Sequence, residues 1–82
     1  MLDIISSMHY ILPMIENKLK IARVTNGNLT QAEVAQKAGC SRQTINSIEN
    51  NKFIPSVELA LRIAQLLHVR VEDIFFITEK DT

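Results

Sequence analysis

The sequence contains a single cysteine, Cys40, in 82 residues. One cysteine excludes an intrachain disulfide framework, and with only two histidines present it argues against a closed structural zinc site. No apolar run reaches the ~18 residues that cross a bilayer. No lysine or arginine precedes Lys18, so the positively charged start of a signal peptide is missing. These absences predict a cytoplasmic protein with no metal or other cofactor and no evident small-molecule ligand.

The formal net charge is zero, but the charges are distributed unevenly along the chain. Residues 18–52 carry six lysines and arginines against two glutamates, a net charge of +4. Residues 1–17 and 53–82 each carry a net charge of −2. A polyanion such as nucleic acid would therefore meet the basic middle segment. Random scatter of so few charges is the alternative interpretation.

The spacing of apolar residues predicts short helices and no period-2 segment long enough for a large sheet. At 46% hydrophobic and 22% charged residues, the composition is that of a globular protein, and 82 residues suffice for one small domain. Domains of this size often gain stability by oligomerising. The predicted fold is all-α. Five helices are expected, at residues 15–24, 31–38, 42–50, 57–67 and 71–75.

Polar residues at the helix boundaries support this division. Thr30 precedes the second helix with Glu33 three residues on, the spacing of a capping box. Gly39 is placed to end that helix in a left-handed conformation. Ser41 and Ser56 are expected to cap the third and fourth helices. In the fourth helix, the residues expected to face inward are Val57, Ala60, Ile63, Ala64 and Leu67.

The apolar run Phe75, Phe76 and Ile77 follows the fifth helix and is rich in β-prone residues. Residues 8–12 are a plausible antiparallel partner for residues 75–78. The two segments would form a short terminal β-ribbon, which needs packing against the domain or a second subunit to be stable.

Two short helices around Gly39, joined by about three residues, form the pattern of a helix-turn-helix. Ala35 is small enough for the second helix to cross close over the first, and Cys40 would fill the angle between them. The outward face of the second helix lacks the Glu and Lys typical of a solvated surface. It carries donors and acceptors that match base edges in a major groove, although a merely polar surface is the alternative. These residues are Arg42, Gln43, Thr44, Asn46, Ser47 and Asn50.

Residues 29–52, together with 55–67 and 71–75, closely resemble the helix-turn-helix domain of the Xre/Cro/phage-repressor family. The resemblance covers about residues 15–76. It implies a compact five-helix, lambda-repressor-like domain that binds double-stranded operator DNA as a homodimer. It also implies an ion pair between Arg23 and Glu49, similar to the family's buried pair.

The resemblance assigns roles to several residues of the predicted DNA-binding site. Gln31 would contact a phosphate and could brace the recognition helix. Arg42, Gln43 and Ser47 fall on base-reading positions. Asn50 and Lys52 fall on the backbone-contacting loop. The complete predicted site is Gln31, Ser41, Arg42, Gln43, Thr44, Asn46, Ser47, Asn50 and Lys52.

The chain departs from the family pattern at four places, the first of which is a turn at residues 25–28 that is one residue longer than usual. His68 stands where a glycine is usual, so it is expected to adopt a left-handed backbone. Arg70 replaces the usual Ser or Thr cap of the fifth helix, which predicts a weak anchor there. Residues 1–13 are additional. We therefore divide the chain into an N-terminal extension at 1–13, the DNA-binding domain at 14–78 and a tail at 79–82.

Other functions are weighed against this interpretation. Cys40 could be a redox sensor, and His9 and His68 could bind a metal, but no neighbouring residues at suitable spacing favour either role. No nucleophile elbow, phosphate loop or nucleotide fingerprint is present, so an enzyme is not expected.

The predicted function is a transcriptional regulator, a repressor that binds a palindromic operator as a homodimer. The alternative is an antitoxin-type interaction module that also represses its own operon, and an activator is a third option. The dimer is expected to be held by the two ends of the chain, with the fourth and fifth helices as the alternative interface.

Overall fold

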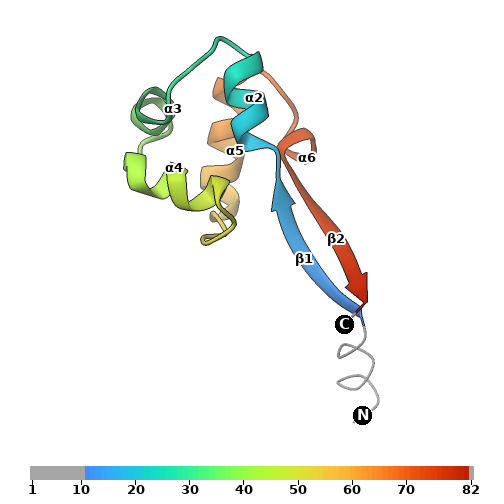
Figure 1. Cartoon of the computed structure of the whole chain (residues 1–82). Coiled ribbons are helices and arrows are strands. Elements are labelled where there is room, and N and C mark those ends of the chain that lie inside the picture. Colours follow the sequence, from blue (N-terminus) through green and yellow to red (C-terminus); the bar gives the residue numbers. More distant parts are fainter. Residues whose placement is uncertain (1–10, 82) are drawn as a thin grey trace.

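The computed structural model describes residues 11–81 of the chain. Within that range five helices pack together and a two-stranded antiparallel ribbon projects from them (Figure 1). The predicted helical fold and the predicted terminal ribbon are both confirmed. In chain order the elements are β1 (Ile11–Asn17), α2 (Leu19–Thr25), α3 (Gln31–Ala38), α4 (Arg42–Glu49), α5 (Val57–Leu66), α6 (Val71–Ile74) and β2 (Phe75–Asp81).

The predicted first helix, 15–24, is wrong at its start. Residues 15–17 belong to strand β1, where Ile15 pairs with Ile77, and helix α2 begins only at Leu19. The spacing of Ile15 and Leu19 suits a helix, but the apolar segment after α6 supplies a strand partner that outweighs this local preference.

The predicted partner of residues 75–78 is wrong as well. These residues pair with 14–17, not with 8–12. The Lys18 main-chain N–H donates to the Ile74 carbonyl oxygen over 2.8 Å, where α6 meets the start of α2. That hydrogen bond sets the register, and Asn17 then lies opposite Phe75. Residues 8–10 lie outside the described residues.

The helix boundaries predicted from capping residues are confirmed. The Glu33 main-chain N–H donates to Thr30 Oγ1 over 3.0 Å, and Glu33 Oε1 accepts from the Thr30 N–H over 2.8 Å. Gly39 ends α3 with φ +80°, where a Cβ atom would also lie 3.2 Å from Arg62 Nη1. Ser41 and Ser56 accept hydrogen bonds from main-chain N–H groups in the first turns of α4 and α5.

Of the two departures from the family pattern near α6, the expected left-handed backbone of His68 is confirmed, and Arg70 is replaced as a cap by a nearby carboxylate. His68 adopts φ +58°, in the left-handed region that a glycine would occupy without strain. Arg70 supplies no side-chain cap. Instead, the Asp73 carboxylate accepts from the Arg70 N–H over 3.1 Å, so α6 keeps half of a capping box.

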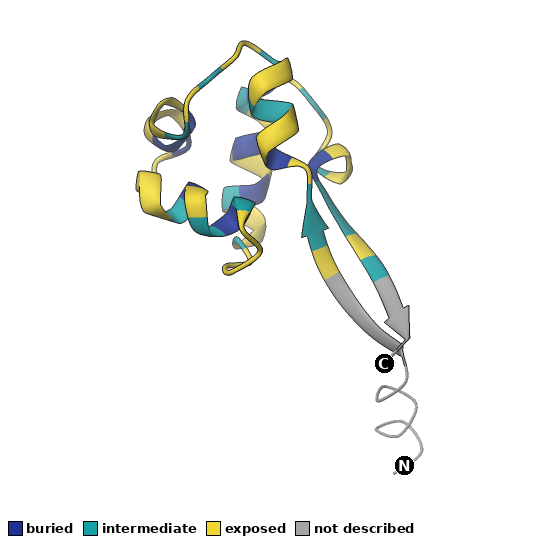
Figure 2. Ribbon diagram, viewed as in Figure 1, coloured by how far each residue is buried: buried dark blue, intermediate teal, exposed yellow. Residues whose placement is uncertain are grey.

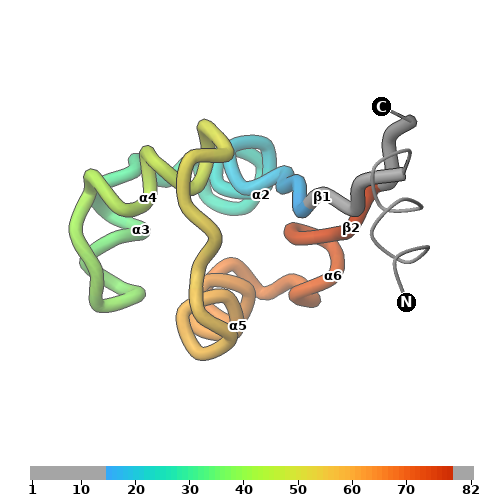
Figure 3. Tube along the Cα trace, turned by 90° about the horizontal axis from the view of Figure 1, so that it is seen from below, coloured from blue at the N-terminus to red at the C-terminus, as the bar shows by residue number. Residues whose placement is uncertain are grey.

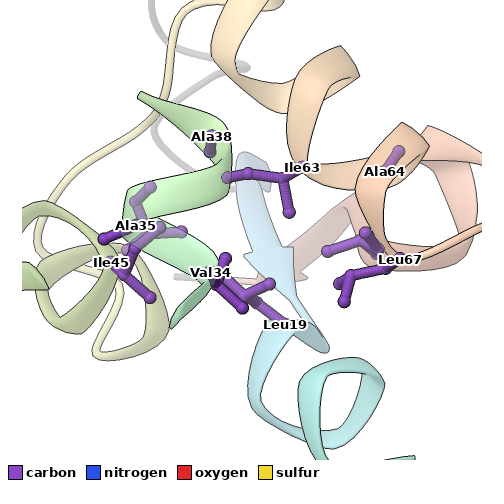
Figure 4. Close-up of a cluster of buried hydrophobic side chains, with 10 residues drawn as sticks. Leu19, Val34, Ala35, Ala38, Ile45, Ile63, Ala64 and Leu67 are labelled. Atoms are coloured by element: carbon purple, nitrogen blue, oxygen red, sulfur yellow. The ribbon is translucent and has the colours of Figure 1, made fainter. Parts of the chain in front are cut away.

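The hydrophobic core lies between α3, α4 and α5 and is closed by the start of α2 and the end of α6 (Figure 4). Ala35 and Ala38 are both buried, and these small side chains let α4 and α5 pack closely on α3. Val57 is 77% exposed, so its predicted inward position is wrong: the first turn of α5 borders an apolar groove instead. The buried members are Leu19, Val34, Ala35, Ala38, Ile45, Ile48, Ile63, Ala64, Leu67 and Ile74.

None of the helices within residues 11–81 is long and apolar enough to cross a membrane.

Candidate nucleic-acid interface

Helices α3 and α4 are joined by only three residues, Gly39, Cys40 and Ser41. The left-handed glycine reverses the chain, and the Ser41 cap starts α4 at once. Ile45 and Ile48 anchor the inner side of α4 in the core. Figure 2 shows that the rest of the helix alternates between exposed and intermediate residues. The arrangement presents a short, firmly held helix with its polar side to solvent.

Hydrogen bonds and a shared groove bring the predicted site residues together in two groups. One row joins α3 to α4: Gln31 Oε1 accepts from Arg42 Nη1 over 3.1 Å and from Asn46 Nδ2 over 3.4 Å, and Asn50 Nδ2 donates to Asn46 Oδ1 over 3.2 Å. The second group lines a shallow groove beside that row with Phe53, and its predicted members are Ser41, Gln43, Thr44, Ser47 and Lys52.

The members of the site differ in how free their side chains are. Arg42, Gln43 and Lys52 are exposed. Ser41 and Thr44 are occupied locally, since Ser41 Oγ accepts from the Thr44 N–H and lies 2.9 Å from Thr44 Oγ1. The first two residues of α4 are therefore both exposed to a ligand, with Arg42 oriented by its hydrogen bond to Gln31 and Gln43 facing the groove beside it.

The predicted ion pair between Arg23 and Glu49 is present. Arg23 Nε donates to Glu49 Oε2 over 2.8 Å, and Nη2 donates to Oε1 over 3.1 Å. The side chains are only 12% and 5% exposed. Hydrogen bonding to Glu49 raises the pKa of the Arg23 guanidinium above its ordinary value. The pair ties α2 to the last turn of α4.

Gln31 braces the second helix, as the resemblance suggested. Its Nε2 donates to Glu49 Oε1 over 3.0 Å, while its Oε1 faces the polar side of α4. One amide thus connects the largely buried ion pair to the exposed surface.

Sequence reasoning missed Asn17, which supports α4 from the ribbon. Its Nδ2 donates to the Ile48 carbonyl oxygen over 2.8 Å and to Asn51 Oδ1 over 2.9 Å. Its Oδ1 accepts from the Leu19 N–H over 3.1 Å at the start of α2. An asparagine just before a helix is a recognisable local signal, but its contacts 31 and 34 residues away are not.

The alternative sites gain no support from the described residues. Cys40 is half-buried at the edge of the core, and burial raises the pKa of its thiol, which disfavours the reactive thiolate. Within residues 11–81 no three His, Cys, Asp or Glu side chains gather as a metal site. His9 lies outside the described residues.

A tight helix pair whose second member is anchored inside and polar outside defines a helix-turn-helix DNA-binding domain. The profile of the helix-turn-helix family matches residues 19–74. The chain therefore belongs to the Xre/Cro-like helix-turn-helix family of DNA-binding transcriptional regulators.

Relatives and a solved structure agree with this assignment. An uncharacterized HTH-type transcriptional regulator of Methanocaldococcus jannaschii is 52% identical over 60 residues, which cover 73% of this chain and 89% of the relative. Another, from Bacillus subtilis, is 33% identical over 66 residues, covering 80% and 98%. The crystal structure of a candidate DNA-binding protein from Bacteroides fragilis has a TM-score of 0.70 at 27% identity, covering 77% of this chain and all of the other.

Proposed function

We propose that this regulator is a cytoplasmic repressor that binds a palindromic DNA operator as a homodimer. The observation that carries the proposal is the face of α4, where exposed Arg42, Gln43 and Asn46 stand on a helix anchored by Ile45 and Ile48. Arginine can bind guanine and glutamine can bind adenine through two hydrogen bonds each. A rigidly held helix with such side chains is suited to reading bases in a major groove.

Base reading is assigned mainly to Arg42 and Gln43, the first two residues of α4. In helix-turn-helix proteins the N-terminal residues of the recognition helix contact base edges. Ser47 lies one turn further along the same groove. Gln31, Asn50 and Lys52 flank the helix and would bind phosphates, which sets the register of α4 on the duplex without reading sequence.

A connected apolar surface supports the homodimer. Ile15 and Ile77 are cross-strand partners, so they share one face of the ribbon, and both are exposed. Ile15 also lines a groove with Ile54, Val57 and Leu61, which are 62%, 77% and 51% exposed. Contiguous exposed apolar residues of this kind mark protein-protein contacts.

The position of this surface suits a dimer that leaves DNA accessible. Helices α3 and α4 lie at one end of the domain and the ribbon leaves from the other, in Figure 1 and in the rotated view of Figure 3. To read two half-sites, a dimer formed through the ribbon side must set two copies of α4 in successive major grooves, ~34–36 Å apart. Occupation of a promoter by such a dimer would exclude polymerase.

Selection of bound duplexes from a random library tests the proposal. The expected result is enrichment of an inverted repeat whose half-sites are centred about one helical turn apart. Enrichment of single, unpaired half-sites would contradict the dimer, and no enrichment over random DNA would contradict base reading altogether.

A further inference from the structure

The side-chain amide of Gln31 lies between a largely buried carboxylate and the exposed face of α4. Its Nε2 donates to Glu49 Oε1 over 3.0 Å, and its Oε1 accepts from Arg42 Nη1 over 3.1 Å. An ionised carboxylate only accepts hydrogen bonds, so the nitrogen of the amide must face Glu49. The reversed amide would set oxygen against oxygen and an NH2 group against the Arg42 guanidinium. Glu49 therefore determines which end of Gln31 is presented to Arg42.

Glu49 is itself held in one position. Its carboxylate accepts two hydrogen bonds from Arg23. Arg23 is fixed in turn, because its Nη1 donates to the Leu29 carbonyl oxygen over 2.8 Å. With 5% of its side chain exposed, Glu49 has almost no surface with which to touch DNA. Any influence on DNA must pass through another residue.

We propose that Glu49 is a positioning residue for DNA reading. Through Gln31 it holds the Arg42 guanidinium in one place and thereby increases the specificity of Arg42 for its preferred base, in addition to supporting the fold. The inference rests on the proposed function, in which Arg42 reads bases. A long side chain that is ordered beforehand loses less freedom when it binds, whereas a base that needs a different guanidinium position breaks the hydrogen bond to Gln31.

The test removes the carboxylate without leaving a lone buried charge. The double variant Arg23→Met with Glu49→Met replaces the ion pair by apolar side chains, an exchange that folded proteins often tolerate. The matched control carries Arg70→Met with Glu72→Met, which removes an exposed pair at the start of α6. Both exchanges leave the net charge unchanged.

The readout is base preference at single positions. Arg42→Ala first identifies the base pair whose preference depends on Arg42. The specificity ratio, the dissociation constant of the substituted duplex divided by that of the preferred duplex, is then measured at that base pair and at all others. We expect the Arg23→Met, Glu49→Met protein to lower this ratio about 2- to 10-fold, which is the effect of one hydrogen bond, and only at the base pair that depends on Arg42. In a protein that already carries Arg42→Ala, the same two substitutions should not change the ratio further.

Two results would overturn the inference: an unchanged ratio at the Arg42 base pair, or an equal loss of affinity for every duplex, which is the signature of a purely structural role. If the double variant does not fold, Gln31→Met severs the same link with the ion pair intact. Because Gln31→Met also removes the proposed phosphate contact, it is judged only by the ratio at the Arg42 base pair, and an unchanged ratio there overturns the inference. If Arg42→Ala changes no single base pair, the proposed base reading by Arg42 is wrong, a failure separate from that of the link.

Discussion

The side-chain amide of Asn17, the last residue of β1, donates to the carbonyl oxygen of Ile48 in the last turn of α4 over 2.8 Å. The end of the ribbon nearest the helices therefore supports α4, the second helix of the helix-turn-helix. The same side chain accepts from the Leu19 N–H, which connects the start of α2 to this junction.

Replacing Asn17 by alanine should lower the free energy of unfolding by about 1–3 kcal/mol. Removal of this side chain leaves the Leu19 N–H without its acceptor and takes one of two donors from the Ile48 carbonyl oxygen, which keeps the Asn51 N–H at 3.0 Å. The loss of these half-buried hydrogen bonds costs about that much. Urea denaturation followed by circular dichroism measures the change. Gln36→Ala, at an exposed position of α3, is the control and should stay within about 0.5 kcal/mol of the wild type. A variant as stable as this control would show that the contact does not support α4.

Glu49→Gln should destabilise the domain by about 3–5 kcal/mol, because it leaves the Arg23 guanidinium largely buried without its counter-charge. Replacing both residues by methionine should cost less than the single change, since no uncompensated charge remains. Thermal unfolding compares the two proteins. A Glu49→Gln protein that melts at the wild-type temperature would refute a stabilising role for the pair.

The capping box of α3 predicts a small acid-dependent loss of stability. Hydrogen bonds from the Thr30 main chain, and then its side chain, lower the pKa of the exposed Glu33 below its ordinary value of 4.5. The ionised form is thus favoured in the folded state, so its contribution is complete above pH 4.5 and declines as the pH falls through the lower folded value. Glu33→Gln keeps a capping partner that does not titrate. The difference in unfolding free energy between wild type and variant should therefore shrink below pH 4.5. A difference that stays constant on acidification would contradict this.

The helix-turn-helix itself could be predicted closely from the sequence. Its boundaries depend on Thr30, Gly39 and Ser41, whose partners lie within a few residues along the chain. The polar face of α4 follows in the same way from helical periodicity around Ile45 and Ile48. Local signals of this kind survive in the fold because no distant contact competes with them.

The ribbon register and the support behind α4 could not be predicted in this way. Ile15 has helical spacing to Leu19, yet its strand partner, Ile77, lies at the other end of the chain. Asn17 and Gln31 reach α4 across 31 and 18 residues, at distances set by how helices and ribbon pack. The Arg23 and Glu49 pair was expected because the chain resembles a known family and because both charges fall on otherwise core-directed helix faces.

Leu61→Asp should convert the proposed dimer to a monomer. Leu61 lies in the apolar groove beside Val57, and a buried carboxylate at the interface would have no partner. The side chain is half exposed, so the domain should remain folded. Sedimentation equilibrium at micromolar concentration measures the mass. Gln65→Asp, one turn further along α5 at an exposed position, is the matched control and should stay dimeric. A Leu61→Asp protein that also stays dimeric would place the interface elsewhere.

The central claim is that α4 reads bases through Arg42 and Gln43, and the most direct measurement is the affinity of single variants for a selected operator, its point variants and random DNA. Arg42→Ala and Gln43→Ala should each lose about 1–3 kcal/mol of discrimination at one base pair per half-site. Lys52→Ala should weaken binding to all duplexes alike and flatten the log-log salt slope by about one unit, as loss of a phosphate contact does. If Arg42→Ala and Gln43→Ala instead weaken specific and random DNA equally, they contact only the backbone, and the account of α4 as the base-reading helix is wrong.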